Sequence, residues 1–317
     1  MAVSQETREE HLNIESITWG GLTWVNIEHP TRLEADYLGQ HYPFNPFDLD
    51  DCLSRTQRPK IDEYKDYLFY IFHFPVYNKM TQVSTHGQVS VFIGDKYLIT
   101  LHSGELRSLI KLFRDCQTNE ESRQANMSYG SGYLLYRIMD RAVDSYFPVI
   151  DKIFKLTEGI EDQVFDERIE ASKEVAILRR DIITQRRIIF PIRTVLAELE
   201  NKLKRFTTTD MSVQYGDLMD HMNKICESLD ELKEIIEVYK DADFVLGTER
   251  LNHIMRILTI IATIVLPFLV VSSIYGMNVH LPGGLTEGSY QTFSIIMVLV
   301  TMLSIGMLFY FRHRRWI

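Results

Sequence analysis

Residues 257–275 read ILTIIATIVLPFLVVSSIY and residues 293–311 read FSIIMVLVTMLSIGMLFYF, and neither stretch contains a charged side chain. A helix rises about 1.5 Å per residue, so each stretch would span roughly 28 Å, close to the hydrocarbon thickness of a bilayer. Uncharged runs of this length are uncommon outside membranes. We therefore expect two transmembrane helices that form a hairpin.

Positive charge is distributed unevenly around the two stretches. Arg250 and Arg256 precede the first, arginines lie among residues 312–317, and the connecting residues 279–292 contain no Lys or Arg. Basic residues that flank membrane spans stay on the cytoplasmic side. We expect a multi-pass protein of the cell inner (plasma) membrane with both termini in the cytoplasm. The alternative is that one or both stretches are buried core helices of a soluble protein.

The composition of the rest of the chain indicates a soluble body. Most of the 317 residues lie outside the two stretches, and the formal net charge is -9. A negative charge makes nucleic acid an unsuitable partner and favours cations. Cys52, Cys116 and Cys226 are widely spaced, so we expect reduced thiols and neither a disulfide framework nor a zinc site. Residues 1–10 have no apolar signal core, which leaves the two spans to direct insertion.

Residues 14–123 alternate between strand and short-helix signals. Runs of aromatic and β-branched residues indicate strands, and Gly94-Asp95-Lys96 between two of them is typical of a hairpin. We expect a cytosolic α/β domain over residues 1–125 with a mostly antiparallel sheet. Its expected strands are 23–27, 67–74, 88–93 and 97–102, and its expected helices are 32–38, 46–53 and 106–116.

Residues 126–256 are expected to be helical. The polar, Ser- and Gly-containing residues 119–132 end the strand signals and indicate a boundary. We expect one long amphipathic helix over 133–166 and a second over 171–206, interrupted only by Pro191.

A third helix is expected to begin near Val213 and to carry a heptad seam. No Gly-Pro pair separates it from the first span, so one helix of roughly sixty residues, about 90 Å long, is the simplest interpretation. A helix this long needs partners along its length, and self-association is the economical solution. The seam consists of Leu218, Met222, Ile225, Leu229, Leu232, Ile236 and Tyr239, with alternating gaps of four and three.

The same rhythm traces one face of this helix through the membrane. If several copies pack in parallel around an axis, this face lines a pore. Asn252 favours a water-filled lumen, because an amide close to the hydrocarbon needs water or a partner. The face carries Asn252, Met255, Leu258 or Thr259, Ala262, Leu266, Leu269 and Ser273.

These residues resemble the CorA family of divalent-cation channels. Residues 275–278 read YGMN between the spans, residues 252–259 read NHIMRILT upstream, and Trp316 lies in a basic tail. The resemblance covers nearly the whole chain and is most specific over 217–278. It implies an α+β cytosolic domain, a long-helix stalk and two C-terminal transmembrane helices, in a funnel-shaped homopentamer with a central pore. The implied segments are 257–275 as pore span, 276–292 as extracytoplasmic loop, 293–311 as second span and 312–317 as cytosolic tail.

The implied selectivity filter is Gly276, Met277 and Asn278 at the outer end of the first span. Mg²⁺ sheds water reluctantly, so a selective mouth can hydrogen-bond to coordinated water through neutral oxygens. A ring of Asn278 amides would supply such acceptors as a metal-contacting group, and Gly276 would let backbone carbonyls approach the axis. The alternative for Asn278 is a helix C-cap or turn residue.

Apolar constrictions are expected below the filter. Met255, Leu258 and Leu266 would stop hydrated ions by dewetting unless the helices spread. Ordinary lipid or core packing is the alternative for each of them. Leu269 and Ser273 replace the family's small or polar pore positions.

The resemblance also places a regulatory Mg²⁺ site between subunits at Asp217. Carboxylates bridged by Mg²⁺ would hold neighbouring subunits together, and loss of the ion would let the pore helices move. The alternative is a solvated acidic helix face. The expected acidic partner is missing at residues 76–79, which read VYNK, and the acids that could replace it are Asp151, Glu158, Glu161 and Asp162.

Three functions remain open. The leading one is a channel for Mg²⁺ uptake, with Co²⁺ or Ni²⁺ as further ions and no organic cofactor. Residues 279–284 read VHLPGG and Glu287 is the one acid in the loop, which keeps open a zinc transporter resembling the ZntB branch. The third is a non-conducting, membrane-tethered scaffold. No nucleotide-binding glycine loop, nucleophile motif or metal-hydrolase spacing indicates an enzyme.

Overall fold

The computed structural model describes residues 12–54, 57–166, 171–277, 291–314 and 316. Contacts divide the chain into two compact units, residues 1–240 and residues 241–317. Helix α8 (Ser212–Tyr275) contributes residues to both units, so the expected long helix through the stalk and first span is confirmed.

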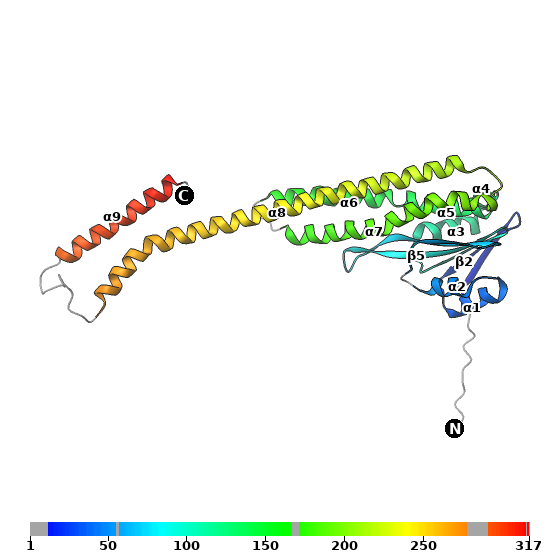
Figure 1. Ribbon diagram of the computed structural model, residues 1–317, viewed down its shortest axis with the longest axis horizontal. Helices are drawn as coiled ribbons and strands as arrows, with labels where there is room; N and C mark the ends of the chain where they lie inside the picture. Colours follow the sequence, from blue (N-terminus) through cyan, green and yellow to red (C-terminus); the bar gives the residue numbers. More distant parts are fainter. Residues whose placement is uncertain (1–11, 55–56, 167–170, 278–290, 315, 317) are drawn as a thin grey trace, which may run out of the picture. The chain divides into compact units, whose positions relative to one another are not determined.

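A six-stranded sheet forms the centre of the first unit (Figure 1). The strand order is β1-β2-β6-β5-β4-β3, and neighbours are antiparallel except for β2 and β6. The expected, mostly antiparallel sheet is confirmed, and Asp95-Lys96 joins β5 to β6 as the predicted hairpin requires. The strands are β1 (Ile14–Trp19), β2 (Leu22–Glu28), β3 (Lys60–Glu63), β4 (Tyr67–Asn78), β5 (Val83–Gly94) and β6 (Tyr97–His102).

Two short helices cover one face of the sheet, α1 (Arg32–His41) and α2 (Pro46–Leu53). Thr31 caps α1 through a capping box with Glu34, and the Asn45 side chain accepts a hydrogen bond from Phe47 N at the start of α2. These caps satisfy amides that have no partner inside the helix. Both helices were expected from the sequence.

The longer helices cover the other face. Trp24 is fully buried there, donates its indole N–H to Thr100 Oγ1 at 3.1 Å and lies edge-on to Phe113 of α3 (Arg107–Thr118). The same core continues through α5 (Ser131–Asp144) to residues 189–203 and 215–229, which belong to the two longest helices. One core therefore joins residues on both sides of position 125.

Our prediction of a single helix over 133–166 is wrong, because the structure has two helices there. α5 ends at Asp144, and α6 (Phe147–Phe165) follows. Pro148 lies in the first turn of α6, where its missing N–H costs nothing; within a continuous helix its ring would clash with the carbonyl of Asp144. The polar residues 119–132 also contain a helix, α4 (Glu120–Met127), capped by the side chain of Asn119.

The second and third long helices were expected and are confirmed. They are α7 (Ser172–Leu203), which runs through Pro191 and ends in a 3-10 turn (Lys204–Phe206), and α8. All seven residues of the heptad seam on α8 are buried within the first unit of one chain. Tyr239 donates its hydroxyl to Glu161 of α6 at 2.8 Å, and Arg179 of α7 pairs with Glu237 at 2.6 Å. The seam part of α8 therefore finds its partners within one chain, because α7 and its neighbours cover it.

A buried carboxylate joins the sheet to the helices. Asp181 of α7 accepts hydrogen bonds from the backbone N–H of Ser84 on β5 and from Gln185 Nε2, the latter at 2.7 Å. Tyr146, at the junction of α5 and α6, donates its hydroxyl to Gln185. Asp181, Gln185 and Ser84 are all buried, so this network fixes β5 against α7.

Asp181→Ala should lower the free energy of unfolding by about 2–4 kcal/mol, because it leaves the Ser84 N–H and the Gln185 amide buried without an acceptor. Denaturant unfolding of the purified protein, followed by circular dichroism, measures the change. Asp151→Ala is the matched control on α6, since Asp151 is exposed and should change stability by no more than about 0.5 kcal/mol. Equal effects of the two substitutions would contradict the assigned network.

Candidate functional site

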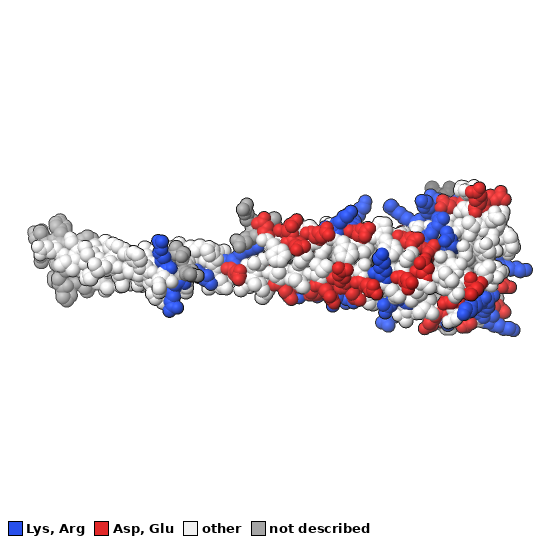
Figure 2. Space-filling model, turned by 90° about the horizontal axis from the view of Figure 1, so that it is seen from above, with Lys and Arg blue, Asp and Glu red and all other residues white. Residues whose placement is uncertain are grey.

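The second unit holds the C-terminal part of α8 and helix α9 (Gln291–His313). Both helices are long and apolar enough to cross a membrane, and few residues of their apolar stretches are buried. Figure 2 shows acidic side chains gathered on the helices of the first unit and white surface over the apolar helices. The threonines within the spans bond to their own helix: Thr259 Oγ1 donates to Met255 O and Thr263 Oγ1 to Thr259 O, both at 2.7 Å. These hydroxyls therefore do not need water inside the hydrocarbon.

One face of α8 in the second unit is covered. Ile260 is buried, and Ile264, Pro267 and Val271 are partly buried at helical spacing from it. On α9, Val300, Ser304 and Phe311 are buried. These residues mark the covered sides of the two helices, and the ring of Trp316 stacks on Phe311.

The predicted pore residues lie on the open side of α8. At about 100° per residue, Leu266, Leu269 and Ser273 lie roughly opposite Ile260 around the helix axis. Each predicted pore residue is exposed in the single chain, Leu266 to 58%. The structure therefore brings the expected set together on one uncovered face, which carries Asn252, Met255, Leu258, Leu266, Leu269 and Ser273. Exposure alone does not separate this face from one that meets lipid, because Ile261 is also 56% exposed.

The open face leads to the predicted filter. Gly276 N donates to Ser272 O at 2.9 Å and Met277 N to Ile274 O at 3.3 Å, so these two residues close the last turn of α8. A Cβ added at Gly276 would lie 3.1 Å from Ser272 O, so any other residue there would require this carbonyl to shift by a few tenths of an ångström. Asn278 lies outside the described residues.

Asp217 lies near the start of α8 with its side chain 64% exposed. Its carboxylate is 3.8 Å from His221 Nε2, and His221 Nδ1 is 3.5 Å from Asp144 of α5. Asp140 lies on α5, like Asp144. Its pKa is raised mainly by burial and further by the negative charges of Asp144 and Asp217. Within one chain, His221 therefore lies between Asp217 and Asp144, and Asp140 lies close enough for the charge of Asp217 to act on it. Arg137 pairs with Asp140 at 3.1 Å.

Sequence reasoning missed these neighbours. Asp140 and Asp144 are four residues apart on α5 and so share a face, a signal that was available in the sequence. Glu161, which we considered as a partner of Asp217, instead accepts a hydrogen bond from Tyr239, about 22 residues or roughly 33 Å further along α8. Within one chain Glu161 is therefore not a neighbour of Asp217. In the part of the chain that the structure describes, no three His, Cys, Asp or Glu side chains are grouped to hold a metal ion.

A folded α+β body is followed by two helices that are long and apolar enough to cross a membrane, and the first has an open face that ends at a Gly-Met turn. This arrangement indicates a membrane protein. The sequence profile of the CorA-like Mg²⁺ transporter proteins matches residues 19–314. The chain therefore belongs to the CorA-like family of transporters.

Individual relatives agree with this assignment. The protein YfjQ of Bacillus subtilis (strain 168), whose name describes it provisionally as a metal ion transporter, is 30% identical over 97% of this chain and 92% of its own length. The cobalt/magnesium transport protein CorA of Thermotoga maritima is 25% identical over 93% of this chain and 83% of its own. The complete structure of the CorA magnesium transporter from Methanocaldococcus jannaschii superposes with a TM-score of 0.76 at 23% identity, covering 95% of this chain and 94% of that one. The last match establishes the fold.

Proposed function

We propose that this protein is a divalent-cation channel for Mg²⁺ uptake, with Co²⁺ or Ni²⁺ as further permeant ions. The observation that carries the proposal is the uncovered face of α8, which runs from Asn252 to Ser273 and ends at the Gly276 turn. An ion needs a wet, continuous path through the hydrocarbon, and one helix face that is left open by α9 can supply it when copies assemble.

The assembly we propose is a homopentamer in the cell inner membrane, with both termini in the cytoplasm. Its pore is lined by the open faces of the first spans, and the second spans lie toward lipid. Arg250 and Arg256 before the first span and Arg312 and Arg314 after the second support this orientation, since cytoplasmic flanks carry the positive charge.

Hydrated Mg²⁺ would meet the Gly276-Met277-Asn278 mouth first. Its coordinated waters are hydrogen-bond donors, so the Asn278 carbonyl oxygens and backbone carbonyls are suitable acceptors and complete removal of water is unnecessary. Further in, Met255, Leu258 and Leu266 would form apolar rings that close the path when the helices are near the axis.

We propose that cytosolic Mg²⁺ near Asp217 holds the closed state. The exposed carboxylate of Asp217 can reach an ion shared with a neighbouring subunit, while Asp144 adds negative charge on the other side of His221. Asp140 contributes less, because Arg137 pairs with it at 3.1 Å. Mg²⁺ binds through one or two carboxylates and keeps several waters, so it would also screen the repulsion among these groups.

Asp217→Asn should raise the cytosolic Mg²⁺ concentration that half-closes the channel several-fold, because the coupling of an effector to a gate amounts to roughly 5–150-fold. Flux into liposomes loaded with graded Mg²⁺ measures the shift. Asp220→Asn is the control, since Asp220 is an exposed acid on the same helix. If the half-closing Mg²⁺ concentration shifts equally in both variants, the effect arises from the overall negative charge of the helix, and the assignment of a site at Asp217 is contradicted.

The ion itself is tested by flux into liposomes that contain the purified protein, with equimolar Mg²⁺ or Zn²⁺ and with or without a proton gradient. Mg²⁺ entry without a gradient supports the channel. Zn²⁺ entry alone assigns the protein to the ZntB-like alternative, and no flux of either ion leaves the tethered scaffold.

A further inference from the structure

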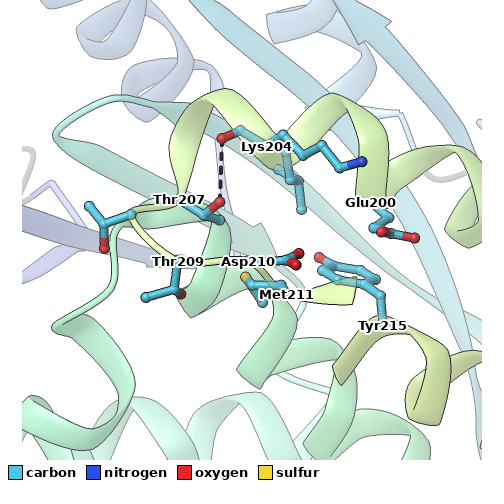
Figure 3. Close-up of a pocket in the computed structure, with 9 residues that line it drawn as sticks. Glu200, Lys204, Thr207, Thr209, Asp210, Met211 and Tyr215 are labelled. Carbon is cyan, nitrogen blue, oxygen red and sulfur yellow. Dashed lines mark hydrogen bonds between the residues drawn. The ribbon is translucent and has the colours of Figure 1, made fainter. Parts of the chain in front are cut away.

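The corner between α7 and α8 forms a partly open polar pocket of about 280 Å³ (Figure 3). The corner is held rigidly against the rest of the first unit. Arg205 donates to Tyr64 O at 2.8 Å and to Tyr67 O at 3.3 Å, and Thr208 N donates to Tyr129 O at 3.2 Å. The pocket is therefore a fixed feature of the folded unit.

A buried hydroxyl group faces this pocket without a partner. Tyr215 is 2% exposed, and its hydroxyl has no hydrogen-bond partner among the described residues. Figure 3 shows the phenol oxygen directed inward among the lining side chains, on the side of Asp210. A buried hydroxyl left without a partner costs about 1–3 kcal/mol, so an ordered water or a bound polar ligand would stabilise this site.

The charges around the pocket favour a cation. Glu200 is half-buried with no ion pair or hydrogen bond in the described part of the chain, and Asp210 accepts from Ser212 N at 3.1 Å and Ser212 Oγ at 3.2 Å. Lys204, the basic side chain in the lining, directs its ammonium to Asn201 Oδ1 at 2.9 Å. The C-terminal carbonyls of α7 add further negative potential.

The lining suits a hydrated ion better than a bare one. It offers two carboxylates and a group of hydroxyls, and the described residues contain no cluster of three His, Cys, Asp or Glu side chains that could replace a water shell. Mg²⁺ keeps several waters at sites with one or two carboxylates. Since one water occupies about 30 Å³ in the liquid, the cavity has room for an ion with waters around it.

We propose that the α7–α8 corner binds a hydrated divalent cation through its coordinated waters, with Glu200 and Asp210 as acceptors and the Tyr215 hydroxyl contacting the shell. Such binding ties the end of α7 to the first turns of α8, the helix that continues into the first span. The site shares no residue with the predicted pore or with the group formed by Asp217, His221, Asp144 and Asp140. The proposed cation binding at this corner is therefore independent of the proposed transport.

Hydrogen exchange of the full-length protein in nanodiscs tests the proposal. Mg²⁺ at ten times its dissociation constant should slow exchange of amides 204–216 roughly tenfold, because a ligand that binds the closed state lowers the population of the open state by this factor. Hexaamminecobalt(III), whose ammine shell does not exchange, should protect the same amides if contact is through the shell. Glu200→Gln and Tyr215→Phe should remove most of the protection, whereas Glu198→Gln, an exposed acid on α7, should keep it.

Each outcome decides the inference. Protection that survives in Glu200→Gln, or is lost in Asp217→Asn, would overturn it, because the effect would then arise elsewhere. No protection of the parent by saturating Mg²⁺ would overturn it too and would leave ordered water as the partner of Tyr215. Asn278→Ala should lose flux but keep the protection, so failure of the channel and failure of this site are distinguishable.

Discussion

Asn278→Ala should reduce Mg²⁺ flux into liposomes by roughly tenfold to a hundredfold. A hydrogen bond to a charged partner contributes about 1.5–3 kcal/mol, and the substitution removes one amide oxygen from every copy at the mouth. The measurement is the initial rate of entry reported by a magnesium-sensitive dye, at matched protein density.

Asn223→Ala provides the control for that result. Asn223 is an asparagine on α8 in the first unit, outside the predicted pore, and its substitution should leave flux unchanged. If Asn278→Ala conducts like the parent with unchanged selectivity, the filter assignment is wrong. If both variants fail and neither assembles, their size on gel filtration separates loss of assembly from loss of conduction.

Leu266→Ser should make the closed channel leak. An apolar ring excludes water from a narrow path, and replacing each leucine by a small hydroxyl lets water, and then hydrated ions, remain there. Lowering the barrier by about 1.4 kcal/mol gives a tenfold rate, so we expect roughly ten times more Mg²⁺ entry at cytosolic concentrations that close the parent. The measurement is flux into liposomes preloaded with Mg²⁺.

Ile261→Ser is the control for Leu266→Ser. The two substitutions are chemically alike and the side chains are similarly exposed, 56% for Ile261 and 58% for Leu266, but Ile261 lies on another side of α8. It should leave the closed state tight, since a serine there meets lipid or a neighbouring helix and can bond to its own backbone. A leak of equal size in both variants would contradict the assignment of the pore face.

The sequence predicted the two long apolar helices and the seam well because their signals are local. An uncharged run long enough to cross a bilayer and a repeat of four and three are visible without knowledge of any neighbour. The sequence analysis missed the break between α5 and α6 although the sequence shows Pro148 there. The amphipathic pattern continues across the junction, whereas the helical backbone is interrupted. The neighbours of Asp217 were missed because helix α5 approaches α8 only in the folded unit, about 75 residues away along the chain.

The sequence by itself determined the α+β body, the long third helix, the two apolar spans, and the face that runs from Asn252 to Ser273. Each of these depends on composition or periodicity within one segment. Only the tertiary structure decided that α7 and its neighbours bury the seam within one chain, that His221 lies between Asp217 and Asp144, and that the hydroxyl of Tyr215 is directed into a pocket with Glu200. These outcomes depend on which distant segments pack together, and that choice is made by the summed burial of many side chains, which no single stretch of sequence contains.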